Sequence, residues 1–497
     1  MKKRSVARHP RRPAPVVLAL LLIIAVGCSP TPTAVPSGTP PETPSPTTPS
    51  ASPGPTPTAS TSPAFIGPSG SPTIGERACP YLPGSPVAVM PDAVLHPPAP
   101  GTEPLASPPP ASTVAAGTTK LQIVVLNALA KAVTNNYVDP KFNGRDWPVI
   151  VARYRKLVEG GLSQGDFYLA MQLLVAELGD DHSQFESPAD RQAFEQELAG
   201  HNEYAGIGVS VDPIPEAGRA AVILTFPGSP AERAGLQPHD LLLAIDGSPI
   251  FDSRGNSMLS RVRGPAGTQV TLTLQRPGEA VHDVTITRAH VDSGYPVESC
   301  VIAGTRVGYI FVPTLLDQTV PGQVRSALKA MTANGPLAGL IIDNRLDAGG
   351  ASSVLQPLLG FFLKGDVGAF QSRTATRRLV IKGEDIGGSQ KVPLVVLVGR
   401  GTVSFGEVMS GVLQASGRAV VVGETSFGNV ETLSNFDFVD GSRAWIAKET
   451  FNPDNAKYGP WEDTGIEPDV TAPTRWDLFT ESNDPALAAS LQALGVH

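Results

Sequence analysis

Residues 29–119 are the part of the sequence that most limits what this chain can fold into. They are mostly proline, serine, threonine, alanine and glycine, and only five of them carry a charge at neutral pH. A segment with so few large apolar side chains cannot bury enough surface to offset the entropy that folding removes. We therefore expect residues 28–119 to form a disordered stalk, and any packed domain to begin after it.

The segment before the stalk has the parts of a secretion signal. Six basic residues lie within the first twelve, and an apolar run continues from Val16 to Gly27. The run is shorter than the ~20 apolar residues that a membrane-spanning helix needs, so we expect residues 1–27 to be removed as a signal peptide. The segment Ala25–Cys28 resembles a bacterial lipobox. The resemblance implies lipidation of Cys28 and attachment to the outer side of the cell membrane, whereas simple secretion with an unmodified Cys28 is the alternative.

Charge and cysteine content narrow the possible partners. The net charge of the whole chain is −8, and leaving out the six basic residues of the signal and the net −3 of the stalk gives −11 for the remainder. An acidic protein of this kind is not expected to bind nucleic acid. Cys79 and Cys300 could pair in an oxidising compartment. No cysteine or histidine spacing is typical of a metal site, so we expect neither a metal nor a cofactor.

Apolar spacing predicts an N-terminal helical domain over residues 120–200. Leu121–Val133 has the helical period, and Ser163 with Asp166 indicates a capping box before a second helix that ends near Leu178. Gly179 is a typical helix stop, so residues 180–183 should form a loop that carries His182. Loops of this kind are frequent locations for catalytic side chains.

The rest of the chain divides into two further patterns. Short β-type runs separated by Gly/Pro turns fill residues 201–292, which predicts a small β domain. From residue 298 to 475, strands alternate with helices, which predicts an α/β layer, with helices near 323–333, after Gly350 and from Glu407. A tail over 476–497 should contain a short helix at 485–494. The fold class is therefore a multidomain α+β and α/β protein.

Three ordered segments in the β region resemble a bacterial protease-type PDZ domain. They are Tyr204–Val209, Phe226–Leu236 and Asp240–Gly247. The resemblance implies peptide binding: backbone N–H groups of a glycine loop hold a terminal carboxylate while a strand pairs with the peptide main chain. A small β-barrel without a ligand is the alternative. The implied peptide-binding residues are Tyr204, Ala205, Gly206, Ile207, Gly208 and Val209.

Ser404 is the candidate nucleophile. The segment Gly401–Glu407 follows the apolar run Val392–Val398 and precedes a predicted helix. A serine in such a strand-turn-helix lies at a helix N-terminus, where the helix dipole and the Phe405 N–H can stabilise developing negative charge. Taken alone, such a serine is more often a helix cap than a nucleophile.

The ordered series of motifs over roughly residues 120–475 resembles the C-terminal processing peptidases and their tricorn-like relatives. The resemblance implies a crotonase-like ββα-spiral core, Ser404 as the nucleophile of a serine peptidase, and polypeptide substrates. It also implies that the turn Asp343–Gly350 brings Gly349 or Gly350 beside Phe405 as an oxyanion donor. Asp347 and Ala348 replace the Asn-Pro usual in the family, and the glycine pair could instead form only a tight turn.

The general base departs from the processing branch of this family. That branch has a lysine 25 residues after the nucleophile, where this chain has Asn429. An amide cannot accept the serine proton at neutral pH. The tricorn-like branch uses a histidine and a glutamate, and His182 and Glu462 match them, which predicts a Ser–His–Glu site. His182 need not be the base in the lysine branch, and Asp463 is the rival of Glu462.

Three functions follow from these patterns. The first is an extracytoplasmic endopeptidase that captures polypeptide C-termini on its PDZ domain and cleaves them by acyl-enzyme chemistry. The second is a peptide-binding scaffold that lost catalysis together with the lysine, as Asn429 suggests. The third is a cell-surface adhesin, which only the stalk favours.

Overall fold

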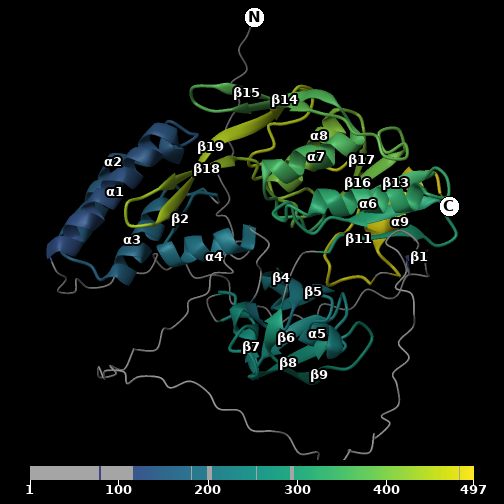
Figure 1. The fold of residues 1–497 in the computed structure, drawn as a ribbon, viewed down its shortest axis with the longest axis horizontal. Helices are drawn as coiled ribbons and strands as arrows, with labels where there is room; N and C mark the ends of the chain where they lie inside the picture. The colour runs from purple at the N-terminus through teal and green to yellow at the C-terminus, as the bar shows by residue number, and fades with distance from the viewer. Residues whose placement is uncertain are drawn as a thin grey trace, which may run out of the picture. The chain divides into compact units, whose positions relative to one another are not determined.

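The computed structural model describes residues 78–79, 116–180, 182–198, 204–252, 255–291, 296–480 and 482–496 (Figure 1). The expected signal peptide, the lipidation site Cys28 and nearly all of the stalk lie outside the described residues. Among the residues that are described, no helix is both long and apolar enough to cross a membrane. The domain boundaries given above stay predictions.

The first described region is a helical layer, as the apolar spacing predicts. Its helices are α1 (Ala116–Asn136), η1 (Phe142–Gly144), α2 (Trp147–Glu159), α3 (Gln164–Ala176) and α4 (Pro188–Leu198). The first three α-helices share an apolar core that includes Tyr137, Trp147 and Phe167. The predicted cap of α3 is present, because the Asp166 N–H donates to the Ser163 hydroxyl at 3.2 Å. Gly179, with a φ of 68°, follows in the left-handed conformation expected of a helix stop.

The PDZ region is an antiparallel sheet in the order β4-β5-β6-β8-β9, with β7 paired to β6. Strand β4 is therefore an edge strand. A separate ladder joins β3 to β10. The elements are β3 (Tyr204–Gly206), β4 (Val209–Ile214), η2 (Pro215–Ala217), β5 (Arg219–Thr225), α5 (Pro230–Arg233), β6 (Leu241–Ile245), β7 (Ser248–Pro249), η3 (Leu259–Val262), β8 (Gln269–Gln275), β9 (His282–Thr287) and β10 (Ala289–Val291).

The core contains a sheet in the order β1-β11-β12-β13-β16-β17-β20, parallel from β12 to β20. Apolar side chains of α6, α7 and α8 pack on one face, and those of α9 pack on the other. The elements are β1 (Ala78–Cys79), β11 (Glu298–Ile302), β12 (Val307–Phe311), α6 (Val320–Thr332), β13 (Gly339–Asp343), α7 (Ser352–Phe362), β16 (Leu394–Val398), α8 (Phe405–Ala415), β17 (Val420–Gly423), β20 (Val470–Thr471) and α9 (Pro485–Ala493).

Two helix starts differ from the sequence-based expectation. The helix expected over 323–333 begins at Val320, where Pro321 occupies the first turn and loses no hydrogen bond by lacking an N–H. The helix expected from Glu407 begins at Phe405, so Ser404 is its N-cap. The second shift matters for function, because it places the Phe405 N–H in the unpaired first turn.

A second sheet, in the order β15-β14-β19-β18, links the core with the helical layer. Its members are β14 (Gly365–Gln371), β15 (Thr376–Ile381), β18 (Thr432–Asp437) and β19 (Arg443–Pro453). Strand β19 is shared: Phe451 belongs to the apolar core around α8, whereas Ala444 and Ile446 belong to the core of α1–α3. Strand β2 (Gln184–Glu186) pairs with β19 directly after His182. This pairing fixes the end of the loop that carries the candidate base.

The edge of the core sheet holds the cysteines. Strand β1 pairs in parallel with β11, with Cys79 opposite Ile302. Cys300, on the same strand β11, is disulfide-bonded. A short stretch inside the region expected to be a disordered stalk is therefore paired with the edge of the core sheet.

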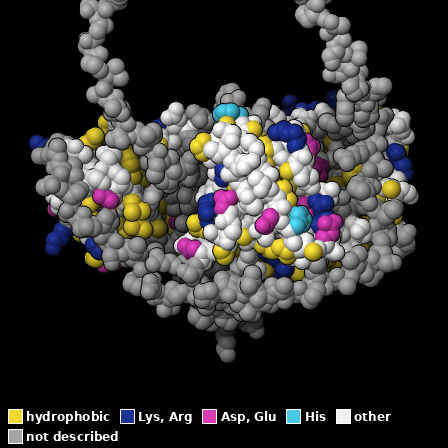
Figure 2. Space-filling view, turned by 90° about the horizontal axis from the view of Figure 1, so that it is seen from below, with side chains coloured by type: hydrophobic (Ala, Val, Ile, Leu, Met, Phe, Trp, Pro, Cys, Tyr) yellow, Lys and Arg dark blue, Asp and Glu magenta, His cyan; other side chains and the backbone are white. Residues whose placement is uncertain are grey.

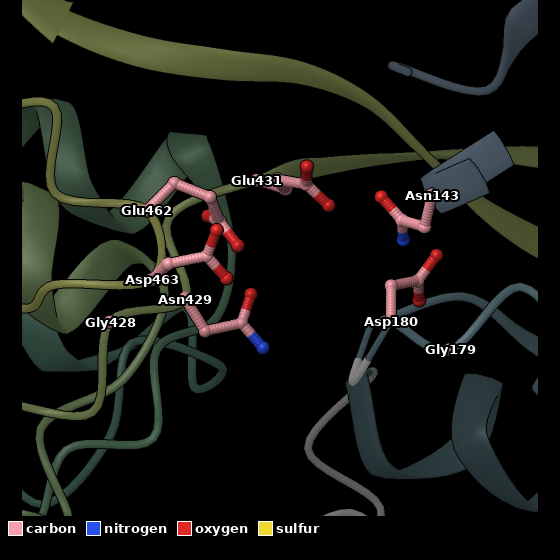
Figure 3. A pocket seen from close by; sticks show the side chains of 8 residues that line it. All are labelled: Asn143, Gly179, Asp180, Gly428, Asn429, Glu431, Glu462 and Asp463. Atoms are coloured by element: carbon pink, nitrogen blue, oxygen red, sulfur yellow. The ribbon is translucent and has the colours of Figure 1, made fainter. Parts of the chain in front are cut away.

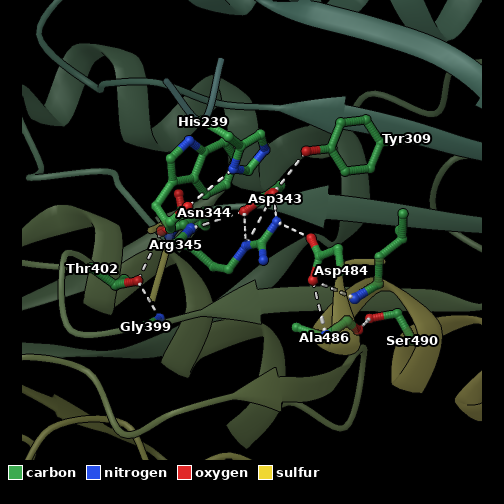
Figure 4. A network of polar contacts seen from close by, with 12 residues as sticks. His239, Tyr309, Asp343, Asn344, Arg345, Gly399, Thr402, Asp484, Ala486 and Ser490 are labelled. Atoms are coloured by element: carbon green, nitrogen blue, oxygen red, sulfur yellow. Dashed lines mark hydrogen bonds and ion pairs between the residues drawn. The ribbon is translucent and has the colours of Figure 1, made fainter. Parts of the chain in front are cut away.

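A buried ion-pair cluster lies beneath the turn that follows β13. Arg345, 1% exposed, contacts the carboxylates of Asp343 at 2.6 Å and Asp484 at 2.7 Å (Figure 4). Its guanidinium also lies 5.1 Å from the ring centroids of both Trp476 and Phe479. Two carboxylates and two aromatic faces thus surround one cation, a geometry suited to the planar guanidinium.

The segment that contains Trp476 also contacts the PDZ region. His239, which precedes β6, stacks on Trp476 with ring centroids 4.5 Å apart, and its Nδ1 lies 3.0 Å from the Trp476 carbonyl oxygen. Burial lowers the pKa of His239 to about 4, so a neutral ring donates from Nδ1 to that carbonyl. The Trp476 indole N–H donates to the Val222 carbonyl at 3.0 Å, and Arg219 donates to Asp477 at 2.8 Å. Side chains after β20 therefore bind strand β5 and the loop before β6.

Candidate active site

Ser404 occupies a backbone conformation that is unusual for a residue with a side chain. It follows β16 and caps α8, with φ 56° and ψ −125°. Positive φ is rare outside glycine, and it persists only where the surroundings impose it. Here the Ser404 N–H donates to the Asn429 carbonyl at 2.8 Å and reaches Glu407 Oε2 at 3.2 Å. Such a strained strand-to-helix turn is typical of a nucleophilic serine.

Glu407 holds the loop that faces Ser404. The side chain is fully buried and accepts hydrogen bonds from the Ser426 hydroxyl at 2.5 Å and from the Gly428 and Asn429 N–H groups at 2.7 Å each. Burial raises the pKa of Glu407, and these donors oppose the shift. That Glu407 holds the loop containing Ser426 and Asn429 was not predicted, although a glutamate three residues after a capping serine is a recognisable signal.

The turn after β13 lies directly against the candidate nucleophile. Gly349 has φ 92°, and a Cβ placed on it would come within 2.6 Å of Ser404 Cβ and 3.0 Å of Phe405 N. The Gly349 N–H donates to Asp347 Oδ1 at 2.9 Å. The Leu315 N–H donates to the Gly349 carbonyl, and the Ala351 N–H donates to the Leu315 carbonyl. These two bonds form a parallel bridge on either side of Gly350, so the Gly350 N–H points away from Leu315. Of the two glycines, Gly350 is the one with an uncommitted N–H.

The contact between Gly349 and Ser404 gives a first prediction. We expect Gly349→Ala to lower the labelling rate of Ser404 by an active-site serine probe at least tenfold, because the new methyl group must displace Ser404 and also opposes the positive φ. Gly388→Ala is the matched control, since it has a similar φ of 91° but no atom within 4 Å of the added Cβ. Equal labelling of the two variants would show that the close approach is not needed.

His182 lies next to Asn429, whose backbone carbonyl accepts the Ser404 N–H. Its backbone N–H donates to Asp180 Oδ1 at 3.0 Å, and its ring lies close to Asn429 and the Glu431 backbone. Burial lowers the pKa of His182 to about 4, although Asp180 and Asn429 favour the charged form. The Nδ1 atom is buried without a hydrogen-bond partner. Within the described residues, no hydrogen bond joins His182 to Ser404 or to Glu462.

Glu462 lines a small polar pocket beside these residues. Figure 3 shows Glu462, Asp463 and Asn429 on one side of it, with Asp180 and Asn143 facing them. The Val430 N–H donates to Glu462 Oε2 at 2.9 Å. The pocket has a volume of about 100 Å³, and its other lining residues are Gly179, Gly428 and Glu431.

The carboxyl groups of this pocket affect one another. Burial, with neighbouring carboxylates, raises the pKa of Glu462 to about 8 and that of Glu431 to about 9. Burial and the neighbouring carboxylates therefore disfavour the ionised form of both side chains. No group of histidine, cysteine and acidic side chains suited to a metal ion occurs in the part of the chain that is described.

The structure thus brings some of the predicted site residues together and leaves others apart. Ser404, Phe405 and the glycine turn are in contact. His182 and Glu462 both lie around Asn429, whose backbone oxygen binds Ser404. Asn429, which stands where the processing branch has its lysine, therefore contacts Ser404 and His182 and shares a pocket with Glu462.

The predicted peptide-binding residues lie at two places in the PDZ region: the start of edge strand β4 and the separate strand β3. The Gly208 carbonyl accepts from the Phe226 N–H at 3.1 Å, and the Ile207 carbonyl accepts from the Ala231 N–H at 2.7 Å. Gly208 has φ 76°, and a Cβ there would lie 2.3 Å from Ser229 Cβ. Val209 begins edge strand β4, whereas Tyr204, Ala205 and Gly206 form β3, paired with β10. One side of β4 can therefore accept a further strand.

Comparison with known proteins agrees with this geometry. The model of peptidase family S41 matches residues 306–472, a PDZ domain model matches residues 227–276, and the C1 domain of tricorn protease matches residues 124–176. The resemblance to C-terminal processing and tricorn-like peptidases that the motifs predict is therefore confirmed. The chain is accordingly a serine-type peptidase with a PDZ domain, and the combination of helical layer, PDZ domain and peptidase core that the sequence predicts is confirmed.

Individual S41 proteins resemble most of the chain. The carboxyl-terminal-processing protease of Synechocystis is 29% identical over 72% of this chain and 82% of its own length. Carboxyl-terminal-processing peptidase 2 of Arabidopsis thaliana, a chloroplastic protein, is 28% identical over 76% of this chain and 74% of its own length. The solved structure of the photosystem II D1 C-terminal processing protease aligns with a TM-score of 0.53 and 25% identity, covering 75% of this chain and 97% of that one.

Proposed function

We propose that this protein is an extracytoplasmic endopeptidase that cleaves extended polypeptides through an acyl-enzyme at Ser404. The observation that carries the proposal is the strained backbone of Ser404, which Asn429 and Glu407 hold against the Gly349 turn. A serine that served only as a helix cap would not need positive φ, since caps normally adopt the β region.

The proposed reaction uses His182 as general base. Ser404 Oγ attacks the scissile carbonyl carbon and passes its proton to the neutral His182 ring, which then protonates the leaving amine. The Phe405 and Gly350 N–H groups bind the oxyanion. Water hydrolyses the resulting ester by the reverse proton transfers. His182 and Ser404 must approach when substrate binds, as catalytic hydrogen bonds often tighten only then. Glu462 is the proposed partner of His182.

The PDZ domain is proposed to deliver substrate. Edge strand β4 offers main-chain groups for pairing, and the turn at Gly208 can present N–H groups to a terminal carboxylate. Figure 2 shows basic and acidic side chains interspersed over the described part of one face, without a block of a single sign. Such a surface gives no reason to expect nucleic acid as a partner.

The anchor at Cys28 belongs to the same proposal. A lipidated Cys28 followed by the stalk would place the peptidase outside the cytoplasm, within reach of exported polypeptides. Metabolic labelling with a radioactive fatty acid tests this directly. We expect label in the wild-type protein and none in Cys28→Ala, and an unlabelled wild-type protein would leave only the secreted form.

A fluorophosphonate probe separates the peptidase from the scaffold that Asn429 suggests. We expect the purified protein to be labelled, and Ser404→Ala to remain unlabelled while folding normally. A folded wild-type protein that stays unlabelled yet binds C-terminal peptides would establish the scaffold instead. Full function after deletion of residues 29–115 would argue against the adhesin.

Peptide binding by the PDZ domain makes a second prediction. We expect a peptide with a free C-terminal carboxylate to bind at least tenfold more tightly than its C-terminally amidated form, because the amide cannot accept the backbone N–H groups as a charged acceptor does. Gly208→Val should remove this difference, since its side chain would displace Ser229. Equal affinity of the two peptides, measured by fluorescence anisotropy, would contradict carboxylate recognition.

A further inference from the structure

Asp347 is a buried carboxyl group that the proposed mechanism does not use. It lies in the turn that directly follows β13, and 0% of its surface is exposed. Its Oδ1 accepts the Gly349 N–H at 2.9 Å, and its backbone carbonyl accepts the Val403 N–H at 2.9 Å. Oδ2 is buried and has no hydrogen-bond partner. Asp347 therefore binds the glycine turn through its side chain and the loop that presents the nucleophile through its backbone carbonyl.

No cation faces the Asp347 carboxyl group within the described structure. Arg345 is two residues away, but its guanidinium is held by Asp343 and Asp484. On α8, the charged neighbour is Glu407, which is itself acidic and bound to Ser426, Gly428 and Asn429. The Asp347 carboxyl group accepts the Gly349 N–H, and the Leu315 N–H, which donates to the Gly349 carbonyl, lies nearby. The surroundings could satisfy one carboxyl oxygen but provide no charge for an anion.

We propose that Asp347 is a neutral carboxylic acid in the working enzyme and that it positions the oxyanion-binding turn. An ionised carboxylate here would be a buried charge without a partner, which costs far more than one unmade hydrogen bond of a neutral acid. Consistent with this, burial raises the pKa of Asp347 well above its usual range, and the two backbone donors offset only part of the shift.

Neutrality has a functional reason that rests on the proposed acyl-enzyme chemistry. By holding the Gly349 N–H, Asp347 fixes the orientation of the next peptide unit, so that the Gly350 N–H stays turned away from Leu315 and available to the oxyanion. A negative charge in the same turn would repel the charge that develops on the oxyanion. A neutral acid keeps the acceptor for Gly349 without adding that charge.

Folding stability tests the protonation state without any assay of activity. An acid protonated in the folded state but ionised in the unfolded state makes the folded state lose stability as pH rises above its unfolded pKa of about 3.9. Asp347→Asn has no such proton. The ratio of folding constants, variant over wild type, should therefore grow about tenfold per pH unit from about pH 5 upward. Urea unfolding at pH 5, 6, 7 and 8 measures it.

The control is Asp385→Asn, an exposed carboxyl group of the same core, for which the ratio should stay constant over this range. A constant ratio for Asp347→Asn as well would show that Asp347 is ionised in the folded protein and would overturn the proposal. This result does not depend on whether Ser404 is active.

Probe labelling tests the positioning role. Asp347→Asn keeps an acceptor oxygen for Gly349, whereas Asp347→Ala does not, so the asparagine variant should label at least tenfold faster than the alanine variant at neutral pH. If ionisation of Asp347 slows the labelling of wild-type Ser404 at alkaline pH, this decrease should be absent in Asp347→Asn. The labelling rate at acidic pH should depend on pH in the same way in both proteins. Equal labelling of both folded variants would refute positioning. Absence of labelling in wild type would refute the proposed function instead.

Discussion

Replacement of His182 by alanine should slow acylation of Ser404 by about 10²–10⁴, the contribution usual for a general base. The rate of fluorophosphonate labelling measures this loss. His282→Ala is the matched control, because His282 is an exposed histidine on β9 of the PDZ domain and should leave the rate unchanged. Unchanged labelling of folded His182→Ala would mean that another group accepts the Ser404 proton.

The pH dependence of the wild-type enzyme adds a second signature of the same residue. A base must be neutral to accept a proton, and burial lowers the pKa of His182 to about 4. Acylation should therefore stay constant from neutral pH down to about pH 5 and fall as the pH passes through about 4. The residual activity of His182→Ala should lack this decrease. A wild-type rate that instead halves near pH 6.5 would indicate a solvent-exposed histidine as base.

The second large effect concerns stability. Arg345→Met should lower the free energy of unfolding by about 3–5 kcal/mol, because it leaves the buried carboxylates of Asp343 and Asp484 without their cation. Chemical denaturation measures the change. Arg378→Met is the control: Arg378 pairs with two carboxylates, Asp366 and Asp454, at exposed positions, and its loss should change the free energy of unfolding far less than Arg345→Met does.

If Arg345→Met lowered the free energy of unfolding no more than the surface control does, the two buried carboxylates would not depend on the Arg345 charge for their stability. The variant also separates stability from function. Because Arg345 precedes the turn that contains Asp347 and Gly349, we expect Ser404 labelling to fall even under conditions where the variant remains folded.

Local signals in the sequence predicted those parts of the fold that depend on neighbours along the chain. The capping box at Ser163 and the stop at Gly179 correctly define helix α3 and the loop after it. The Gly/Pro-punctuated runs correspond to the strands of the PDZ sheet. Ser404 was located at a helix N-terminus because an apolar strand, a turn and a helix follow one another within a few residues, although the helix was expected only from Glu407. These features need no information about distant contacts.

Helix α2 was not predicted as a separate element, although its cap at Asp146, the proline in its first turn and the helical spacing of its buried residues are local signals. Features that depend on distant segments could not be predicted in this way. The acidic pocket joins Asp180 with Glu431 and Glu462. The two glutamates lie more than 250 residues after Asp180 in the chain and belong to a different layer. Long-range placement of this kind follows from the sheet that β2 and β19 form, not from any local pattern.

The stack of His239 on Trp476 limits how this protein can be divided. Trp476 is 5% exposed, and His239 and Val222 of the PDZ region cover it, while its opposite contact is the Arg345 guanidinium. A shortened enzyme without residues 201–292 would open an aromatic surface to water and strip Asp477 of Arg219. The PDZ region thus also covers part of the peptidase core, and we expect replacement of either part alone to leave this aromatic cluster uncovered.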